Sequence, residues 1–138
     1  APHEMQHISA LKNQTNALLF SKANNTNIRN SNVLIIDSIG ILSSIYKYGN
    51  IAYIGGGFGA GIHNILEAVA FGLPVIFGPN YQKFKEAKDL IALGGAKRIS
   101  NYQELKSEII SYLNFDASIP INYIRNNSGA TRSIIEHI

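Results

Sequence analysis

A glycine-rich stretch at residues 55–61 constrains the fold of this chain more than any other feature. Five of its seven positions are glycine, and glycine loses more backbone entropy on folding than any other residue. A folded protein accepts that loss where the backbone must turn sharply or approach another group closely. The stretch follows residues 51–54, a short apolar run typical of a buried strand. It precedes four apolar residues at helical spacing, namely Ile62, Ile65, Leu66 and Val69.

A strand, a glycine-rich turn and a helix in this order predict an anion site. The first turn of a helix presents free N–H groups and a partial positive charge, which suit a phosphate. Gly72 and Pro74 are expected to end the helix. His63, Asn64 and Glu67 are spaced to share one helix face. They could contact a ligand there, or Asn64 could simply cap the helix and leave Glu67 in solvent.

Two common phosphate-binding motifs do not fit. Residues 55–60 match the loose dinucleotide pattern Gly-x-Gly-x-x-Ala, but residues 77–81, about 20 positions further on, contain no acid for a ribose. The Walker pattern requires Lys and then Ser or Thr after its last glycine. Here Gly61 is followed by Ile and His. The phosphate ligand is therefore neither a standard Rossmann dinucleotide nor a P-loop nucleotide.

The composition is that of a globular domain. The 138 residues are 46% hydrophobic and 15% charged, which is enough for one domain with a sizeable core. Cysteine is absent, so no disulfide framework or thiolate metal site is expected. The net charge of +3 is modest and the basic residues are scattered, so we expect no nucleic-acid partner. No apolar run is long enough to span a membrane and no signal peptide is visible. Because the chain opens Ala-Pro-His-Glu, we expect it to be part of a longer protein.

Residues 3–7 match the zinc-peptidase pattern His-Glu-x-x-His. Two His residues four apart on a helix could hold zinc, with Glu4 as the base. The metzincin extension of this pattern would need Gly at Ala10 and His at Asn13. Because the third ligand is missing, we expect no metal site, and a zinc peptidase is kept as an alternative that metal analysis would test.

Short apolar runs alternate with helical patterns along the chain, which predicts an α/β fold with a right-handed, doubly wound parallel sheet. The expected strands are 17–20, 33–36, 51–54, 74–77 and 96–99. The expected helices begin near Pro2, near Ile41 with Asp37 or Ser38 as the cap, and after Gly61. A further helix is expected from Gln82 to Leu93, ended by Gly94 and Gly95, and another after Asn101 as the cap. A terminal helix is expected to end near Ile138. Residues 21–32 are expected to form a surface loop and residues 114–120 a linker.

The turns after Ile36, Ile54 and Phe77 all follow expected strands. In a parallel sheet the carboxyl ends of the strands meet at one edge, where such folds bind ligands. The sequence therefore predicts a nucleotide-type site at that edge.

Several motifs together resemble a known family. They look like the C-terminal domain of the 3-deoxy-D-manno-octulosonic acid (Kdo) transferases of lipopolysaccharide synthesis, and their order covers essentially the whole chain. The motifs are Ala-Pro-His-Glu at 1–4, Asp-Ser-Ile-Gly at 37–40, Gly-Gly-Gly-Phe at 55–58, Gly-Ile-His-Asn-Ile-Leu-Glu-Ala at 61–68, Gly-Leu-Pro-Val-Ile-Phe-Gly-Pro-Asn at 72–80 and Asn-Ser-Gly-Ala-Thr at 127–131.

The resemblance implies a GT-B fold of two Rossmann-like halves. Residues 1–138 would be a single, truncated Rossmann-like domain that binds a nucleotide sugar and lacks the N-terminal acceptor domain. The whole enzyme would transfer Kdo from CMP-Kdo to a lipid A precursor at the cytoplasmic face of the bacterial inner membrane, without a cofactor. The fragment would be soluble, and would meet the lipid and the membrane only through the full-length protein.

The resemblance also implies which residues contact CMP. These are Pro2, His3, Ile39, Gly40, Ile41, Asn64, Ile65, Leu66 and Glu67. Pro2, His3 and Asn64 would lie at helix starts, where N–H groups suit a phosphate. Glu67 would accept hydrogen bonds from the ribose hydroxyls. Many members have Arg at the position of His3 and Glu at the position of Ile41. The family's catalytic Glu lies in the N-terminal half, so no catalytic residue is expected here and the fragment alone should be inactive.

Two further readings stay open. The chain could belong to another GT-B enzyme, a UDP-sugar transferase or an epimerase, and CMP against UDP binding would separate these. It could also be a non-enzymatic module of response-regulator type, with Asp37 as the phosphoacceptor. That module needs an accompanying acidic pair, which Asp37 lacks.

Overall fold

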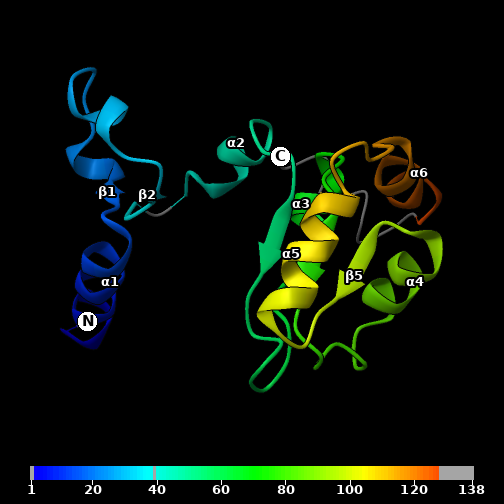
Figure 1. The fold of residues 1–138 in the computed structure, drawn as a ribbon. Helices are drawn as coiled ribbons and strands as arrows, with labels where there is room; N and C mark the ends of the chain where they lie inside the picture. The colour runs from blue at the N-terminus through cyan, green and yellow to red at the C-terminus, as the bar shows by residue number, and fades with distance from the viewer. Residues whose placement is uncertain (1, 39, 128–138) are drawn as a thin grey trace. The chain divides into compact units, whose positions relative to one another are not determined.

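A computed structural model describes residues 2–38 and 40–127 of the chain. It divides the chain into two compact units, Ala1–Leu42 and Ser43–Ile138, and each is described by itself (Figure 1). The prediction of one domain over residues 1–138 stays a prediction.

The first unit begins with helix α1 (Pro2–Thr15), which confirms the expected N-terminal helix. Strands β1 (Leu18–Leu19) and β2 (Leu34–Ile35) form a two-stranded parallel sheet. Both strands lie inside the expected runs but are shorter. The expected surface loop between them contains two exposed 3-10 helices, η1 (Phe20–Lys22) and η2 (Asn27–Asn30).

Asp37 does not have the capping role that the sequence suggested. Its carboxylate accepts hydrogen bonds from the Ser21 backbone N–H at 2.9 Å and from the Ser21 hydroxyl. The strand register explains the pair, because Leu19 lies opposite Ile35 and two more residues along each strand bring Ser21 beside Asp37. The Ser21 hydroxyl and N–H lower the pKa of Asp37. Asp37 therefore joins η1 to the end of β2, and the following helix α2 (Leu42–Tyr46) begins without it.

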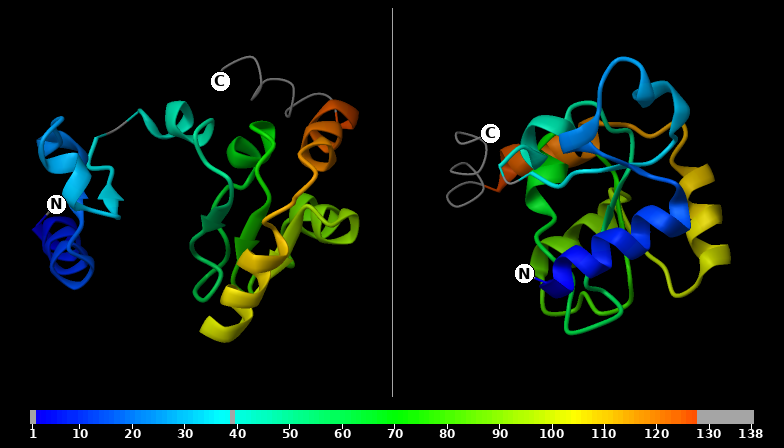
Figure 2. Two further views of the ribbon diagram at one scale, coloured as in Figure 1. Left: turned by 45° about the horizontal axis from the view of Figure 1, so that its top comes forward. Right: turned by 90° about the vertical axis from the view of Figure 1, so that its left-hand side faces the viewer.

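The second unit contains a three-stranded parallel sheet in the order β3 (Ala52–Ile54), β4 (Val75–Phe77), β5 (Ala96–Arg98). All three strands fall inside the expected runs, so the α/β class with parallel strands is confirmed. The register pairs Ile54 with Phe77 and Phe77 with Arg98, so the strands end together. Figure 2 shows the strands and the helices around them in two further views.

Helices cover both faces of this sheet. Val75 and Phe77 pack in the main core with residues of α3 (Leu66–Ala70), α4 (Lys85–Leu93) and α6 (Ser118–Asn126). Between them in sequence, Ile76 faces the other side and packs with Ile99 and Tyr112 beside α5 (Tyr102–Ser111). All three β4 residues are fully buried, as expected for a strand in a covered parallel sheet.

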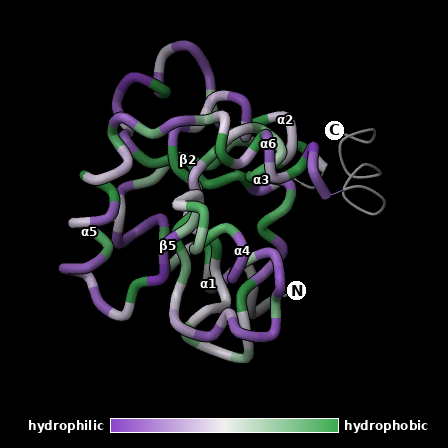
Figure 3. Tube along the Cα trace, turned by 90° about the vertical axis from the view of Figure 1, so that its right-hand side faces the viewer, coloured by the Kyte–Doolittle hydropathy of each residue, from purple (hydrophilic) through white to green (hydrophobic). Residues whose placement is uncertain are grey.

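The helix ends follow the sequence signals. Gly72 and Gly94 have φ of +82° and +88°, so each ends the helix before it in a left-handed conformation. The Asn101 side chain accepts from the Glu104 N–H at 2.8 Å, and the Glu104 carboxylate accepts from the Ser100 N–H at 3.1 Å. This reciprocal pair confirms the predicted cap of α5. Figure 3 shows the alternation of hydrophilic and hydrophobic residues along α5.

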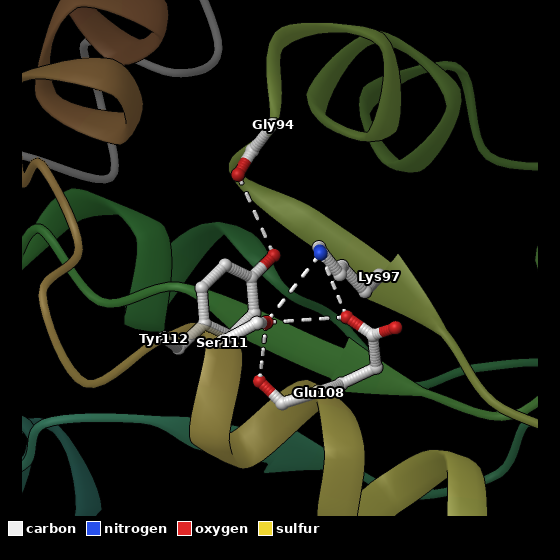
Figure 4. Close-up of polar contacts among 5 residues, drawn as sticks. All are labelled: Gly94, Lys97, Glu108, Ser111 and Tyr112. Carbon is white, nitrogen blue, oxygen red and sulfur yellow. Dashed lines mark hydrogen bonds and ion pairs between the residues drawn. The ribbon is translucent and has the colours of Figure 1, made fainter.

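Polar contacts hold α5 to the edge strand β5 (Figure 4). The Lys97 ammonium lies 2.7 Å from the Glu108 carboxylate and donates to the Ser111 hydroxyl at 3.4 Å. The Tyr112 hydroxyl points to the Gly94 carbonyl at 3.5 Å. Burial, followed by the Glu108 charge, raises the pKa of Tyr112.

The expected linker at residues 114–120 is partly wrong, because α6 begins at Ser118. Pro120 lies in its first turn, where proline is tolerated. Tyr123 and Ile124 are buried against the main core. The helix contains weak helix formers, so its stability depends on this packing rather than on propensity, and the sequence pattern did not reveal it. The terminal helix expected to end near Ile138 lies outside the described residues.

No helix within the described part of the chain is both long enough and apolar enough to cross a membrane.

The Tyr123 hydroxyl joins α6 to α4, and its ionisation makes the stability of the fold fall at alkaline pH. Its hydroxyl donates to the Asp89 carboxylate at 3.0 Å, and Asp89 also accepts from Lys85 at 2.7 Å. Burial and the hydrogen bond to Asp89 raise the pKa of Tyr123 to about 12. The unfolded value is about 10, so this stabilisation is present below pH 10 and is lost as the pH rises through the folded value.

We expect Tyr123→Phe to lower the free energy of unfolding at pH 8 and to make its decline between pH 8 and pH 11 shallower than in the wild type. Urea unfolding at both pH values measures this. Tyr102→Phe is the control, because Tyr102 is 74% exposed. An equally steep decline in Tyr123→Phe would contradict the role of the Tyr123–Asp89 pair.

Candidate glycine-loop site

Two of the three predicted turns lie side by side. Because Ile54 pairs with Phe77, the glycine-rich loop at residues 55–61 and the turn at residues 78–81 leave the sheet at the same edge. The third turn, after Ile36, belongs to the unit Ala1–Leu42 and is described separately. The convergence is therefore confirmed for the second and third turns of the prediction.

The backbones of these two turns touch at glycine. A Cβ atom added to Gly57 would lie 2.5 Å from the Gly78 nitrogen, and one added to Gly78 would lie 2.7 Å from the Gly57 carbonyl carbon. Real Cβ atoms do not approach other atoms this closely. Gly56 has φ of +92°, and a Cβ there would overlap the Gly61 carbonyl oxygen. Gly57 and Gly78 are explained by the packing of one turn against the other, and Gly56 by the close approach of the loop to itself.

Hydrogen bonds close the loop further. The N–H groups of Gly59 and Gly61 donate to the Gly56 carbonyl at 3.0 and 3.2 Å, and the His63 N–H donates to the Gly55 carbonyl at 2.9 Å. These N–H groups are thus used within the protein and are not offered to a phosphate. The anion site expected from the loop would have to use other donors.

The helix after the loop starts later than predicted. It was expected to begin near Ile62 or Asn64, but α3 begins at Leu66. The Ile62 N–H donates to the Asn80 carbonyl at 3.1 Å and the His63 N–H to the loop, so these residues stay in a non-helical turn. The Asn64 side chain accepts from the Leu66 N–H at 3.0 Å. The cap position of α3 is Ile65, which makes no side-chain cap bond, so the alternative of Asn64 as the helix cap is wrong.

Of the predicted CMP contacts at residues 64–67, some lie at the surface and others pack in the core. Asn64 is exposed and Glu67 is half-buried. Ile65 is only 1% exposed and belongs to the main core, so a ligand could meet Ile65 only through its backbone. Leu66 also packs against that core. Burial, followed by the Glu67 charge, raises the pKa of Tyr46.

The other predicted contacts lie in the first unit. Pro2 and His3 are the first residues of α1, and their side chains are outside what the structure describes. Ile39 is also outside the described residues. Gly40 has φ of +90° and is exposed, and Ile41 is half-buried. The assignment of these residues to a CMP site stays a prediction.

Among the described residues, no group of three His, Cys, Asp or Glu side chains could hold a metal ion. The side chains of the His-Glu-x-x-His match at residues 3–7 fall outside the description, so the zinc alternative is untested.

The two larger described grooves lie away from the glycine loop. One, of about 560 Å³, lies between α4 and α6 and includes Asp89, Ile119 and Tyr123. The other, of about 520 Å³, includes Gly49 and Gly72 and lies where β3 and β4 begin. Neither is lined by a predicted CMP contact.

The sequence did not single out Asn80 as a site residue. Its N–H donates to the Gly57 carbonyl at 2.8 Å, and its side-chain amide donates to the Gly59 carbonyl. The sequence signal that could have indicated Asn80 is an asparagine in the turn after a strand, opposite a glycine-rich loop.

Comparisons with known proteins agree on one family. The chain is 30% identical over 126 residues to the 3-deoxy-D-manno-octulosonic acid transferase of Rickettsia prowazekii, covering 91% of this chain and 26% of that protein. It is 35% identical over 91 residues to the enzyme of the same name from Aquifex aeolicus, covering 64% of this chain and 26% of that protein. No protein-family model matches the chain.

A solved structure has the same fold. The crystal structure of the C-terminal CMP-Kdo binding domain of WaaA from Acinetobacter baumannii matches with a TM-score of 0.68 and 20% identity. The match covers 99% of this chain and 66% of that chain.

Parallel strands with helices around them give the chain an α/β fold of the same class as this WaaA domain. Within that class, the chain belongs to the Kdo transferase family, as its motifs suggested. It spans about a quarter of the length of the curated relatives it matches, at 26% of the first two.

The contact between Gly57 and Gly78 gives a stability prediction. Gly57→Ala places a methyl group against the Gly78 backbone, which cannot move aside as a flexible side chain would. We expect a loss of about 1–3 kcal/mol in unfolding free energy, the usual range for overpacking. Gly59→Ala is the control, since its nearest contact would be the Gly56 carbonyl oxygen at 3.7 Å. Thermal or urea unfolding measures both, and equal stability of the two variants would contradict the backbone contact.

Proposed function

We propose that this chain is the donor-binding part of a glycosyltransferase that transfers Kdo from CMP-Kdo to a lipid A precursor. The observation that carries the proposal is the 30% identity over 91% of the chain to a Kdo transferase. The likeness in fold to a CMP-Kdo binding domain agrees with it. The alternatives of a UDP-sugar enzyme and an epimerase have no comparable support.

The proposed donor site lies where β3 and β4 end. Asn64 and Glu67 reach the surface there, while Ile65 fixes the segment in the core. Glu67 accepts hydrogen bonds from the ribose hydroxyls, and the Ile65 and Leu66 contacts are made by the backbone. The family resemblance separately implies CMP contacts at Pro2, His3, Ile39, Gly40 and Ile41 of the first unit.

The whole protein supplies what this chain lacks. Transfer of a sugar to a hydroxyl needs a positioned base to accept the proton, with donor and acceptor held in line. In the proposal, the base and the lipid A precursor belong to an N-terminal half, and the full-length enzyme works at the cytoplasmic face of the inner membrane. The chain alone binds donor without catalysing transfer and needs no cofactor.

The direct test compares the affinity of the chain for CMP with its affinity for UMP. We expect ¹⁵N-labelled chain to bind CMP more tightly than UMP, with amide shifts concentrated at Gly40 and at residues 64–67. Two-dimensional NMR titration with each nucleotide measures both affinity and location. Tighter binding of UMP would favour a UDP-sugar enzyme, and shifts that avoid these residues would refute the site.

Glu67 provides the test of a single contact. A carboxylate that accepts from two ribose hydroxyls makes charge-assisted hydrogen bonds worth roughly 1.5–3 kcal/mol. Glu67→Gln should therefore weaken CMP binding by about tenfold to a hundredfold, as measured by isothermal titration calorimetry.

Asp116→Asn is the matched control for Glu67→Gln. It also replaces a carboxylate by an amide, but Asp116 lies just before α6 and accepts from the Ser118 N–H at 2.9 Å. The neighbouring Ala117 lies beside Gly72, at the start of β4 rather than at its end. If both variants bind CMP like the wild type, Glu67 is an ordinary surface residue of α3.

A further inference from the structure

Three hydrogen-bonding groups of Asn80 bond to the glycine loop or to the residue that follows it. Its N–H donates to the Gly57 carbonyl at 2.8 Å, and its carbonyl accepts from the Ile62 N–H at 3.1 Å. Its side-chain Nδ2 donates to the Gly59 carbonyl. Asn80, in the turn after β4, therefore holds residues 57, 59 and 62 in place.

The conformation of the loop sets the position of the proposed donor contacts. Ile62, the last of these three residues, is 4% exposed, and only one residue separates it from Asn64. The His63 N–H donates to the Gly55 carbonyl, so the residue just before the segment 64–67 is fixed to the loop. A shift of the loop would therefore move Asn64 directly.

We propose that Asn80 is a positioning residue, whose side chain holds the glycine-rich loop so that Asn64 and Glu67 meet the donor nucleotide. This inference rests on the proposed function, because it concerns the same CMP site. Asn80 acts through the loop and does not itself need to touch the ligand.

The Nδ2 bond to Gly59 is the part that substitution can remove. The two backbone bonds of Asn80 persist whichever side chain stands at this position. Asn80→Ala deletes the Nδ2 donor. Asn80→Asp keeps the size and shape of the side chain but turns an oxygen toward the Gly59 carbonyl, so that two acceptors face each other.

The experiment compares four forms of the chain: wild type, Asn80→Ala, Asn80→Asp and Asn101→Ala. Asn101→Ala is the matched control, since Asn101 also makes a single side-chain bond to the backbone, to the Glu104 N–H at 2.8 Å. For each form we would measure the thermal midpoint, the affinities for CMP and for cytidine, and amide hydrogen exchange at residues 55–67.

We expect both Asn80 variants to bind CMP roughly threefold to tenfold more weakly than the wild type, as the loss of one hydrogen bond implies. Asn80→Ala should weaken CMP and cytidine equally, because the loop has moved and no phosphate contact is lost. Amide exchange should quicken at residues 57–62. Asn101→Ala should lower the thermal midpoint and leave CMP affinity unchanged.

Three outcomes would overturn the inference. If the wild type binds no CMP, the proposed function and the role of Asn80 fail together. If the wild type binds CMP and both Asn80 variants bind it equally well, only the positioning role fails. If Asn101→Ala loses as much CMP affinity as Asn80→Ala, the effect reflects general stability rather than the loop. Asn80→Asp keeps the test valid if Asn80→Ala does not fold.

Discussion

The contact between the Gly57 and Gly78 backbones is the constraint on which the site depends. Parallel pairing ends β3 and β4 at the same level, and the two turns that follow must then share the same space. Glycine at both positions allows the turns to pack directly on each other. The loop is thereby closed, and the segment 64–67 leaves it at a fixed place above the core.

The sequence predicted those parts of the fold that local chemistry decides. Continuous apolar runs located the strands of the second unit, and Gly72, Gly94 and Asn101 marked helix ends through φ and capping preferences that belong to the residues themselves. The same reasoning failed for α6, because Pro120 and several Asn residues conceal a helix that packing stabilises. It also failed for Asp37, whose partner Ser21 is set by strand register.

The candidate site was predicted in outline for a similar reason. A glycine-rich run after a strand indicated a turn at the carboxyl edge, and family motifs added Asn64 and Glu67. The sequence could not indicate that Gly57 faces Gly78, or that Asn80 holds the loop, since both are contacts between segments about 20 residues apart. The role of a glycine depends on which group lies beside it in the folded chain. Here that neighbour is another backbone, although the pattern alone suggested a phosphate.

The burial of Ile65 has a consequence for how this segment can evolve. Asn64 is exposed and Glu67 half-buried, while Ile65, one of the two residues between them, is almost fully enclosed, so recognition and core share one short stretch of chain. Substitutions that refill the interior at Ile65 would shift the neighbouring polar groups as well. Changes in the packing at Ile65 and changes in nucleotide preference are therefore linked. Lineages that keep one nucleotide should therefore also keep the volume of the side chain at this position.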